Sequence, residues 1–313
     1  MPVQFLPYAF FDGRYVPIGE MSISLTTQAV QYGGGVFGGI RGYLDRDGST
    51  INLFRLADHF TRFTQSAALI KCALPADVTG LCDIAVELTR RNYVASNLYY
   101  RPFAYNGGDD VAPSLSGKPG FALYMFPLGD FLPTSGISVM VSSWRRVSDN
   151  AIPARGKVSG AYINSAIVKD EAKTYGFDDA LVLNDRGKVG EASAANVMIV
   201  RQGTLVTPPV SADILEGITR RTVLQLATDL GLPWQEREID RTELYVADEV
   251  FLCGTGAQIA PVTSVDKRVV GTGRPGPVAL RVQARFLDAV AGRLPEYAAW
   301  LTRVPAPVTV ART

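Results

Sequence analysis

One lysine in the middle of the chain has the surroundings that amine chemistry requires. Lys157 lies in the segment Ala154-Arg155-Gly156-Lys157-Val158-Ser159-Gly160, before a predicted helix, and its neighbours are small enough to admit a ligand. A lysine amine in such a place can form an imine with a carbonyl group. The same segment also fits a solvated loop, so Lys157 by itself gives a hypothesis and not a site.

An acidic residue further along the chain is the second candidate. Glu191 lies in Gly190-Glu191-Ala192-Ser193-Ala194-Ala195-Asn196, after a predicted hairpin and among small residues that permit a ligand to approach. A carboxylate facing a pyridine nitrogen keeps that nitrogen protonated, which lets the ring accept electrons. A turn glutamate exposed to water would have the same local sequence.

Three places carry groups that suit a phosphate. The segment Leu215–Arg220 leads into a helix predicted to start near Thr219, where the first backbone N–H groups have no partner within the helix. Gly254-Thr255-Gly256 follows a predicted strand and forms an exposed backbone turn. Arg62, one helical turn after His59, adds a guanidinium that forms charge-assisted hydrogen bonds. Each also has an ordinary explanation, as a helix cap, a turn and a solvent-facing arginine.

The hydrophobic pattern before residue 128 predicts a group of strands with two helices. Strands are predicted at Tyr8–Phe11, Arg14–Ile18, Val36–Tyr43, Ile51–Phe54, Leu98–Tyr105 and Phe121–Phe126, and helices at Leu56–Lys71 and about Val78–Asn92. Residues 128–136 are dense in proline and glycine, which predicts a linker between domains.

A second group of elements follows this linker. Its strands are predicted at Ile137–Ser143, Ala180–Leu183, Val189–Ala192, Asn196–Val200, Thr204–Val206, Glu249–Cys253 and Lys267–Val270, and its helices at Ile163–Thr174, Thr219–Leu230 and after Pro277, where the last helix completes the chain. Strands and helices are grouped without regular alternation. We therefore predict an α+β protein with a small domain at 1–127 and a larger one at 137–313.

Composition argues against several classes of protein. The 313 residues include 47% hydrophobic ones and carry a net charge of +1, which gives no electrostatic reason for a nucleic-acid partner. The single histidine, His59, cannot supply a multi-histidine metal site, and Cys72, Cys82 and Cys253 are too scattered for a zinc cluster. We expect no metal, buried thiols, no membrane association and a cytoplasmic location.

Taken in order, these segments resemble the branched-chain amino-acid aminotransferases, which are class IV, fold type IV, pyridoxal-phosphate enzymes. Five separated matches carry the resemblance: Tyr32–Arg41 (YGGGVFGGIR), His59–Arg62 (HFTR), Tyr99–Pro102 (YYRP), Leu215–Arg220 (LEGITR) and Val246–Phe251 (VADEVF) with Gly254-Thr255. Five motifs in one order outweigh the ordinary explanation of each. The resemblance implies a second domain with a β-barrel-like core and a transaminase that passes the amino group of leucine, isoleucine or valine to 2-oxoglutarate.

The resemblance also implies roles toward pyridoxal 5′-phosphate. Lys157 would carry the cofactor as a Schiff base (the aldimine) and act as the proton-transfer base, Glu191 would pair with the pyridine nitrogen, and Tyr162 would hydrogen-bond the phenolic oxygen. The remaining cofactor-binding residues would hold the phosphate: Arg62, Gly217, Ile218, Thr219, Gly254 and Thr255.

For the substrates, the resemblance implies that Tyr99 and the Thr255-Gly256 backbone receive the α-carboxylate. Arg101 would meet the second carboxylate of glutamate or 2-oxoglutarate. Related enzymes are homodimers in which residues of one subunit reach the other's pocket, so a homodimer or higher homo-oligomer is expected. The further pocket residues would be Phe37, Gly39 and Phe131, with Tyr32 and the loop 107–111 acting across the interface.

Two departures from the family pattern leave the substrate open. Gly38 stands where the branched-chain enzymes have glutamate, and Phe131 stands where a tyrosine is expected. Both changes predict a roomier, more apolar pocket that would also admit bulky amines. An (R)-selective amine or D-amino-acid transaminase is therefore the main alternative, followed by an aminodeoxychorismate lyase and a non-catalytic cofactor binder.

Overall fold

The computed structural model describes residues 3–109, 111–115, 117–129 and 135–307, and it contains two compact units. The first unit comprises the described residues of Met1–Gly129, Gly156–Gly160 and Asp288–Thr313. The second comprises those of Asp130–Arg155 and Ala161–Leu287. The segment with Lys157 therefore packs with the first unit. The linker predicted at 128–136, most of which lies outside the described residues, stays a prediction.

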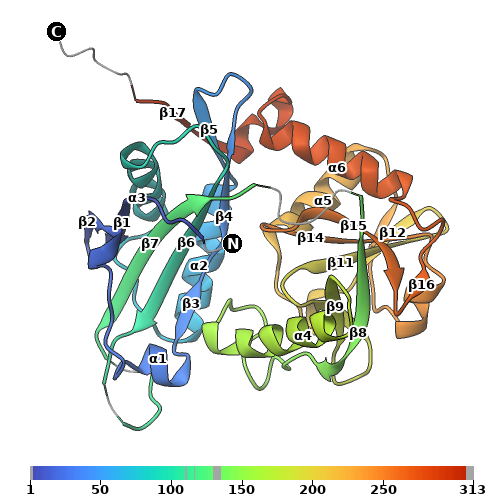
Figure 1. The fold of residues 1–313 in the computed structure, drawn as a ribbon, viewed down its shortest axis with the longest axis horizontal. Helices are drawn as coiled ribbons and strands as arrows, with labels where there is room; N and C mark the ends of the chain where they lie inside the picture. The colour runs from blue at the N-terminus through green and yellow to red at the C-terminus, as the bar shows by residue number, and fades with distance from the viewer. Residues whose placement is uncertain (1–2, 110, 116, 130–134, 308–313) are drawn as a thin grey trace. The chain divides into compact units, whose positions relative to one another are not determined.

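The first unit is built on a sheet with the strand order β17-β5-β4-β6-β7-β1-β2, and β3 pairs with β6 (Figure 1). Every strand pair in it is antiparallel. Asp12 and Gly13, both at positive φ, form the turn of the first hairpin. The strands are β1 (Tyr8–Phe11), β2 (Arg14–Pro17), β3 (Gly35–Phe37), β4 (Ile40–Leu44), β5 (Thr50–Phe54), β6 (Leu98–Asn106), β7 (Pro119–Pro127) and β17 (Leu301–Pro305).

The helices α2 (Leu56–Leu69) and α3 (Val78–Arg91) pack together and against one face of this sheet, and the short α1 (Gln28–Tyr32) precedes β3. The Thr89 hydroxyl of α3 lies 2.8 Å from that of Tyr100, which is fully buried. Side chains alternate between the faces of a strand, so the half-buried Arg101 next to Tyr100 points to the opposite face. The first unit therefore has one face covered by helices and one open face.

The second unit has a mixed sheet with the order β10-β9-β8-β15-β14-β11-β12-β13, and β16 pairs with β15. Strand β8 is parallel to both of its neighbours, β9 and β15. The elements are β8 (Ile137–Arg145), α4 (Tyr162–Thr174), β9 (Asp179–Leu183), β10 (Val189–Ala192), β11 (Asn196–Arg201), β12 (Thr204–Thr207), α5 (Ile218–Asp229), β13 (Trp234–Glu236), β14 (Glu249–Gly254), β15 (Gln258–Val265), β16 (Arg268–Val269) and α6 (Pro277–Val290).

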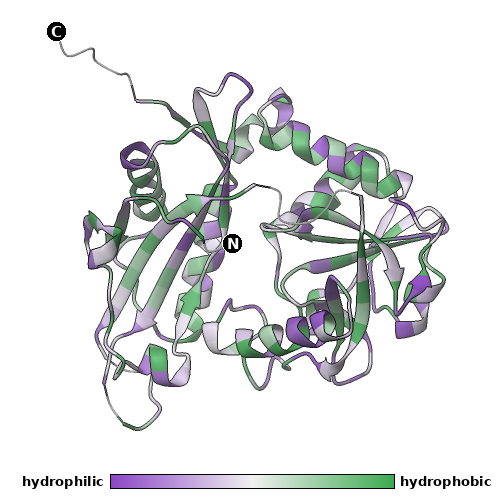
Figure 2. Ribbon diagram, in the orientation of Figure 1, coloured by the Kyte–Doolittle hydropathy of each residue, from purple (hydrophilic) through white to green (hydrophobic). Residues whose placement is uncertain are grey.

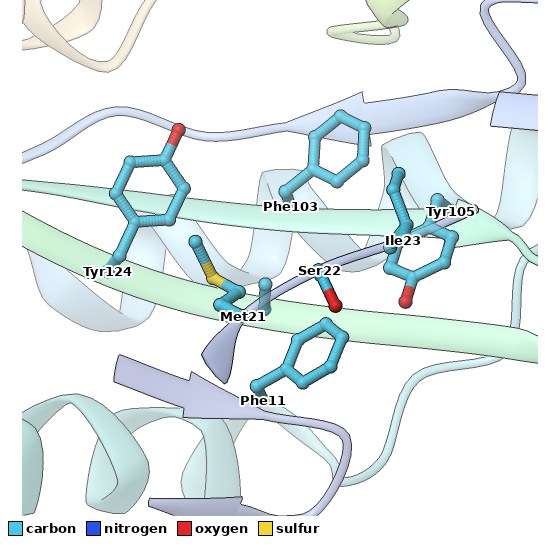
Figure 3. A pocket seen from close by; sticks show the side chains of 8 residues that line it. Phe11, Met21, Ser22, Ile23, Phe103, Tyr105 and Tyr124 are labelled. Carbon is cyan, nitrogen blue, oxygen red and sulfur yellow. The ribbon is translucent and has the colours of Figure 1, made fainter. Parts of the chain in front are cut away.

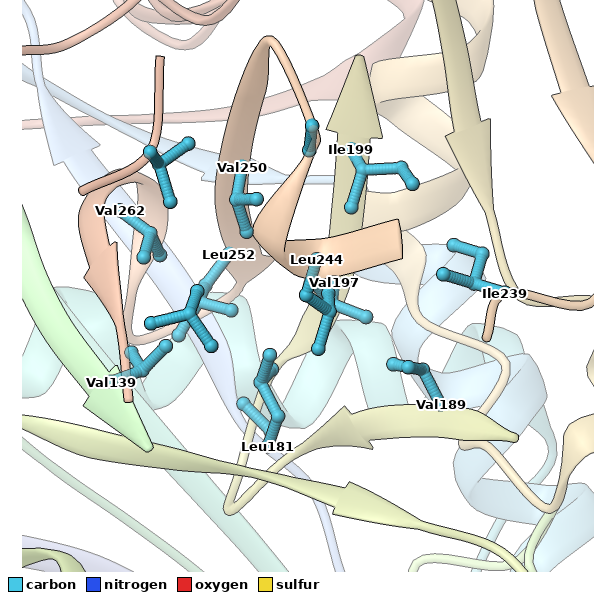
Figure 4. Close-up of a cluster of buried hydrophobic side chains, with 14 of the residues drawn as sticks. Val139, Leu181, Val189, Val197, Ile199, Ile239, Leu244, Val250, Leu252 and Val262 are labelled. Carbon is cyan, nitrogen blue, oxygen red and sulfur yellow. The ribbon is translucent and has the colours of Figure 1, made fainter. Parts of the chain in front are cut away.

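A cluster of aliphatic side chains forms the core inside this curled sheet. Figure 4 shows Val139, Leu181, Val197 and Leu252 converging from neighbouring strands, and all four are buried. Helix α6 is amphipathic, with alternating hydrophobic and hydrophilic stretches in Figure 2 and buried residues at helical spacing (Ala279, Val282, Phe286 and Ala289). Aliphatic burial of this extent is the main stabilising contribution to the unit.

Most of the predicted elements are confirmed, and the others need correction. The predicted strand Val36–Tyr43 is interrupted at Gly38-Gly39 and forms β3 and β4. Helix α1 and strands β13 and β15 were not predicted, and β17 follows the helix that was expected to complete the chain. Cys72 and Cys253 are buried as expected, whereas Cys82 is half-buried. Among the helices that the structure describes, none combines the length and hydrophobicity that a membrane crossing needs.

Candidate functional site

The main chain of Lys157 is held on both sides within the first unit. Its N–H group donates to the Ser66 hydroxyl of α2 at 3.1 Å, and its carbonyl accepts from the Phe37 N–H of β3 at 3.0 Å. The next residue, Val158, forms an isolated antiparallel bridge with Val36. The main chain of this loop residue is thus hydrogen-bonded on both sides, as that of a strand residue is, which is what a positioned amine needs.

The Lys157 amine lies on an aromatic surface. Its Nζ is 4.8 Å from the centre of the Phe37 ring, and the side chain is half-buried. An ammonium group over a ring face is attracted by the ring's quadrupole, so Phe37 stabilises the charged amine in this position.

Arg62 lies one turn from Ser66 on α2, and the two residues are linked. The Ser66 hydroxyl donates to the Arg62 carbonyl at 2.9 Å while it accepts from Lys157. Arg62 is half-buried, so its side chain is not fully solvated. Ser66 thus connects the main chains of two of the predicted cofactor-binding residues.

Tyr99 and Gly39 fit each other closely. A Cβ atom at Gly39 would lie 1.9 Å from the Tyr99 hydroxyl, so only glycine leaves room for this tyrosine. The ring of Tyr99 stacks on Phe126, with 5.3 Å between the centroids. The Tyr99 hydroxyl is therefore held at a defined place on the open face of the sheet.

Arg101 lies on the same face, between two aromatic rings. Its Cζ atom is 4.8 Å from the centre of Phe37 and 5.4 Å from that of Tyr99. Its Nε is buried without a hydrogen-bond partner among the described residues. An arginine that lies between aromatic rings and whose Nε–H donor has no partner among the described residues is suited to binding a carboxylate.

Tyr124 is a neighbour of Arg101 that the sequence analysis missed. It pairs with Arg101 across β6 and β7, which places both side chains on one face. Burial raises the pKa of Tyr124, while the Arg101 charge opposes this rise. No motif marks Tyr124, because its role depends on strand register.

A hollow of about 250 Å³ adjoins Tyr124 on this face of the first unit (Figure 3). Its walls are mainly aromatic and aliphatic, so the face offers apolar surface close to a cation. The lining residues are Phe11, Met21, Ser22, Ile23, Phe103, Tyr105, Ala122 and Tyr124.

Gly38 does not create the additional room that the sequence analysis expected. A Cβ atom there would lie 2.6 Å from Pro102 Cγ and 3.8 Å from the Phe63 ring of α2. The position thus faces Pro102 and the helix-covered side of the sheet, and that space is already filled. Phe131, the other departure, lies outside the described residues.

Glu191 is buried in the second unit and has three hydrogen-bonded partners. Its Oε1 lies 2.9 Å from Arg146 Nη2, and its Oε2 accepts from Asn196 Nδ2 at 3.0 Å and from the Leu215 N–H at 3.1 Å. Three donors on a buried carboxylate stabilise its ionised form. The prediction that Glu191 could be an exposed turn residue is thereby excluded, and Arg146 is a partner that the sequence did not indicate.

The first turn of α5 offers donors for an anion. Its N-cap is Gly217, which has no side chain to cap the helix, and a Cβ there would lie 2.0 Å from Asn196 Oδ1. The backbone N–H groups at the start of the helix, with the hydroxyl of Thr219, are the type of group that binds phosphate. Ile218 and Thr219 are both buried, so an anion held there would be shielded from water.

The other predicted residues have the expected local settings. Thr255 and Gly256 lie in the tight turn that joins β14 to β15, where Gly254 pairs with Gln258. Tyr162 is the first residue of α4 and is half-buried. Tyr32, in the first unit, ends α1, is 44% exposed and donates its hydroxyl hydrogen to the Val111 carbonyl.

Comparison with known proteins gives one consistent result. The amino-transferase class IV family model matches residues 35–265. A probable branched-chain-amino-acid aminotransferase of Synechocystis sp. is 40% identical over 304 residues, which cover 96% of this chain and 98% of that protein.

Two solved structures are similar over almost the whole chain. The branched-chain aminotransferase of Thermoproteus uzoniensis with norvaline has a TM-score of 0.92 at 38% identity, covering 96% of this chain and 100% of that one. The branched-chain amino acid aminotransferase of Thermobaculum terrenum in its PLP-bound holo form has a TM-score of 0.90 at 37% identity, covering 96% and 99%. The similarity therefore includes the fold of both units.

Proposed function

This chain belongs to the class IV aminotransferases, and on that premise we propose that it is a pyridoxal-phosphate-dependent transaminase that moves the amino group of branched-chain L-amino acids to 2-oxoglutarate. The observation that carries the choice of substrate class is Arg101 between Phe37 and Tyr99. A half-buried arginine on the open face, with its Nε buried, favours substrates with a carboxylate over simple amines. The names of the relatives, which are branched-chain enzymes, agree with this choice.

The residues present fit the cofactor. By the family resemblance, Arg62, the start of α5 and the Gly254-Thr255 turn would hold the phosphate. The buried Glu191 carboxylate, kept ionised by three donors, suits a protonated pyridine nitrogen. The Lys157 amine would bind the aldehyde carbon, and the Tyr162 hydroxyl would donate to the phenolic oxygen.

When bound, pyridoxal phosphate supplies an electron sink that makes the Cα proton of an amino acid acidic. Lys157 Nζ would take this proton from Cα and deliver it to the cofactor, which requires the amine to be neutral at that moment. Glu191 would keep the pyridine nitrogen protonated. The main-chain contacts of Lys157 with Ser66 and Phe37 limit the arc over which the amine moves.

Substrate orientation follows from the same assignment. The Tyr99 hydroxyl and the Thr255-Gly256 backbone would bind the α-carboxylate, and Phe37 would contact the aliphatic side chain. When glutamate or 2-oxoglutarate is the partner, Arg101 would bind the second carboxylate. One pocket then accepts an apolar and an anionic side chain in turn, because the cation lies on an aromatic surface.

The proposal includes a homodimer or a higher homo-oligomer in the cytoplasm. Several large apolar side chains of the first unit are exposed around Tyr32, and Leu25 and Val111 are exposed by 81% and 88%. An exposed apolar group of this kind is typical of a protein interface. The exposed residues are Ile23, Leu25, Val30, Tyr32, Val111 and Leu115.

A half-reaction titration tests the proposed function. The yellow holoenzyme is mixed separately with L-leucine, L-glutamate, D-alanine and (R)-1-phenylethylamine, and loss of the visible absorption band is followed. Fast bleaching by L-leucine and L-glutamate is expected. Bleaching by D-alanine or the amine alone would instead establish the alternative transaminase, and pyruvate release from aminodeoxychorismate would establish the lyase. Lys157→Ala should abolish turnover and retain part of the cofactor binding.

A further inference from the structure

A buried hydroxyl group connects two residues that the proposed function assigns to the cofactor. We propose that Ser66 is a positioning residue that fixes the main chain of Lys157 relative to Arg62, and thereby sets where the lysine amine can reach. This inference rests on the proposed function, in which Lys157 and Arg62 bind opposite ends of pyridoxal phosphate. Ser66 itself touches neither substrate nor cofactor in this proposal.

The hydrogen bonds of Ser66 use both capacities of its hydroxyl. Oγ donates its hydrogen to the Arg62 carbonyl at 2.9 Å and accepts from the Lys157 N–H at 3.1 Å. Ser66 is 1% exposed, so water cannot easily replace it as the acceptor. Loss of the hydroxyl would leave a buried N–H group to find another partner, which favours a shift of the lysine backbone.

Further hydrogen bonds of residues 157–160 come from the other side. The Phe37 N–H donates to the Lys157 carbonyl at 3.0 Å, the Ser159 hydroxyl donates to the Gly33 carbonyl at 2.9 Å, and the Gly160 N–H donates to the same carbonyl at 3.2 Å. These contacts all belong to β3 and the residues just before it. Ser66 therefore supplies a hydrogen bond by which α2, the helix of Arg62, holds the lysine main chain.

The position of the Lys157 main chain relative to Arg62 matters because the lysine amine must reach two places. Its amine must reach the aldehyde carbon when the cofactor is held by its phosphate, and it must reach Cα and C4′ during proton transfer. A misplacement of about 1 Å at a reacting group can cost about a hundredfold in rate. A partial release of the segment, with β3 still attached, should cost about tenfold in kcat.

The test compares Ser66→Ala with Thr64→Val in the holoenzyme. Thr64 is on the same helix, and its hydroxyl donates to the Phe60 carbonyl at 2.9 Å, so Thr64→Val removes a similar bond within the helix without touching the lysine segment. Four quantities are measured: kcat, KM for L-leucine, the cofactor dissociation constant and the pH at which the visible absorption band of the bound cofactor changes. The urea midpoint of each apoenzyme reports folding.

We expect Ser66→Ala to lower kcat about tenfold with less than a threefold change in KM, and to shift the spectral titration by at least half a pH unit. Thr64→Val should leave kcat, KM and the spectral titration unchanged. Equal effects of the two variants, or a lower urea midpoint of Ser66→Ala with an unchanged titration, would show that Ser66 only stabilises α2 and would overturn the proposal.

A second variant covers the case in which Ser66→Ala does not fold. Ser66→Cys keeps a similar volume but offers a weaker acceptor, so it should shift the spectral titration in the same direction by a smaller amount, and an unshifted titration would refute the proposal. The two hypotheses can fail separately. If the wild-type enzyme binds pyridoxal phosphate but L-leucine does not bleach it, the proposed substrate is wrong, whereas the spectral shift still tests Ser66.

Discussion

Arg146 and Glu191 form a buried ion pair in the second unit, with 2.9 Å between Nη2 and Oε1 and side-chain exposures of 7% and 8%. The arginine is fixed in turn, because its Nε donates to the Asp213 carbonyl at 3.0 Å. Desolvation offsets much of the attraction in such a pair, so its net contribution to stability is small. Its consequence is that the Glu191 carboxylate is held in place by a cationic partner of the protein itself.

Removing Arg146 alone should therefore be more damaging than removing the pair. We expect Arg146→Met to lower the free energy of unfolding of the apoenzyme by about 3–5 kcal/mol, because it leaves a buried carboxylate without its cation. The double variant Arg146→Met/Glu191→Gln should recover at least half of this loss. Urea unfolding followed by circular dichroism measures both values.

The adjacent Arg145 provides the control for this experiment. Its side chain is exposed and donates to the Asn184 carbonyl, so Arg145→Met should cost less than about 1 kcal/mol. Additive losses in the double variant would mean that Arg146 and Glu191 act independently, against the ion-pair interpretation.

The local sequence predicted most of the elements, because turns and periodic apolar residues are local signals. Asp12-Gly13 marked the first hairpin, and the apolar spacing from Leu56 marked α2. Strand β15 escaped prediction because Pro261 lies inside it, and a proline usually excludes a sheet strand. The interruption at Gly38-Gly39 also escaped, since it depends on Pro102 and Tyr99 of another strand.

The residues of the candidate site also fall into two groups, those that the local sequence indicates and those that only the structure reveals. Small neighbours indicated Lys157 and Glu191 as candidates, and a motif indicated the start of α5; their roles toward the cofactor stay predictions. Ser66, Tyr124 and Arg146 have no distinctive sequence surroundings. They became candidates only because the structure shows their contacts with residues far away in the sequence. Such contacts depend on strand register and helix packing, which one sequence does not reveal.

Arg101 offers a test of how the pocket accepts two kinds of substrate. Arg101→Met should raise KM for L-glutamate and 2-oxoglutarate by about 10- to 100-fold, because a charge-assisted hydrogen bond to the second carboxylate is lost. For L-leucine, kcat/KM should change by less than about fivefold. Steady-state kinetics with each donor provide the comparison. A uniform loss for all donors would place Arg101 on the α-carboxylate instead.

The fit between Gly39 and Tyr99 gives a steric prediction. Gly39→Ala would place a Cβ atom 1.9 Å from the Tyr99 hydroxyl, so the ring must move away. We expect KM for all amino-acid donors to rise about tenfold or more while the cofactor dissociation constant is unchanged. Gly19→Ala is the matched control, because a Cβ at Gly19 meets nothing within 4 Å. Normal KM values for Gly39→Ala would exclude Tyr99 as a carboxylate ligand.

Arg237 and Glu243 make stability depend on pH in the acid range. Two hydrogen bonds from the guanidinium, at 2.9 and 2.8 Å, hold the pKa of Glu243 below its ordinary value of 4.5, although burial opposes this. Since the folded-state pKa is lower than that of the unfolded chain, the contribution is complete above about pH 5 and is lost as the pH falls through the folded-state value. Glu243→Gln should therefore destabilise the protein by about 0.5–1 kcal/mol at pH 6.5 and by less at pH 3. Urea midpoints of the wild type and the variant at both pH values measure this destabilisation. Arg237→Met should reduce the pH dependence of stability by the same amount as Glu243→Gln. A destabilisation that is the same at both pH values would contradict the assignment.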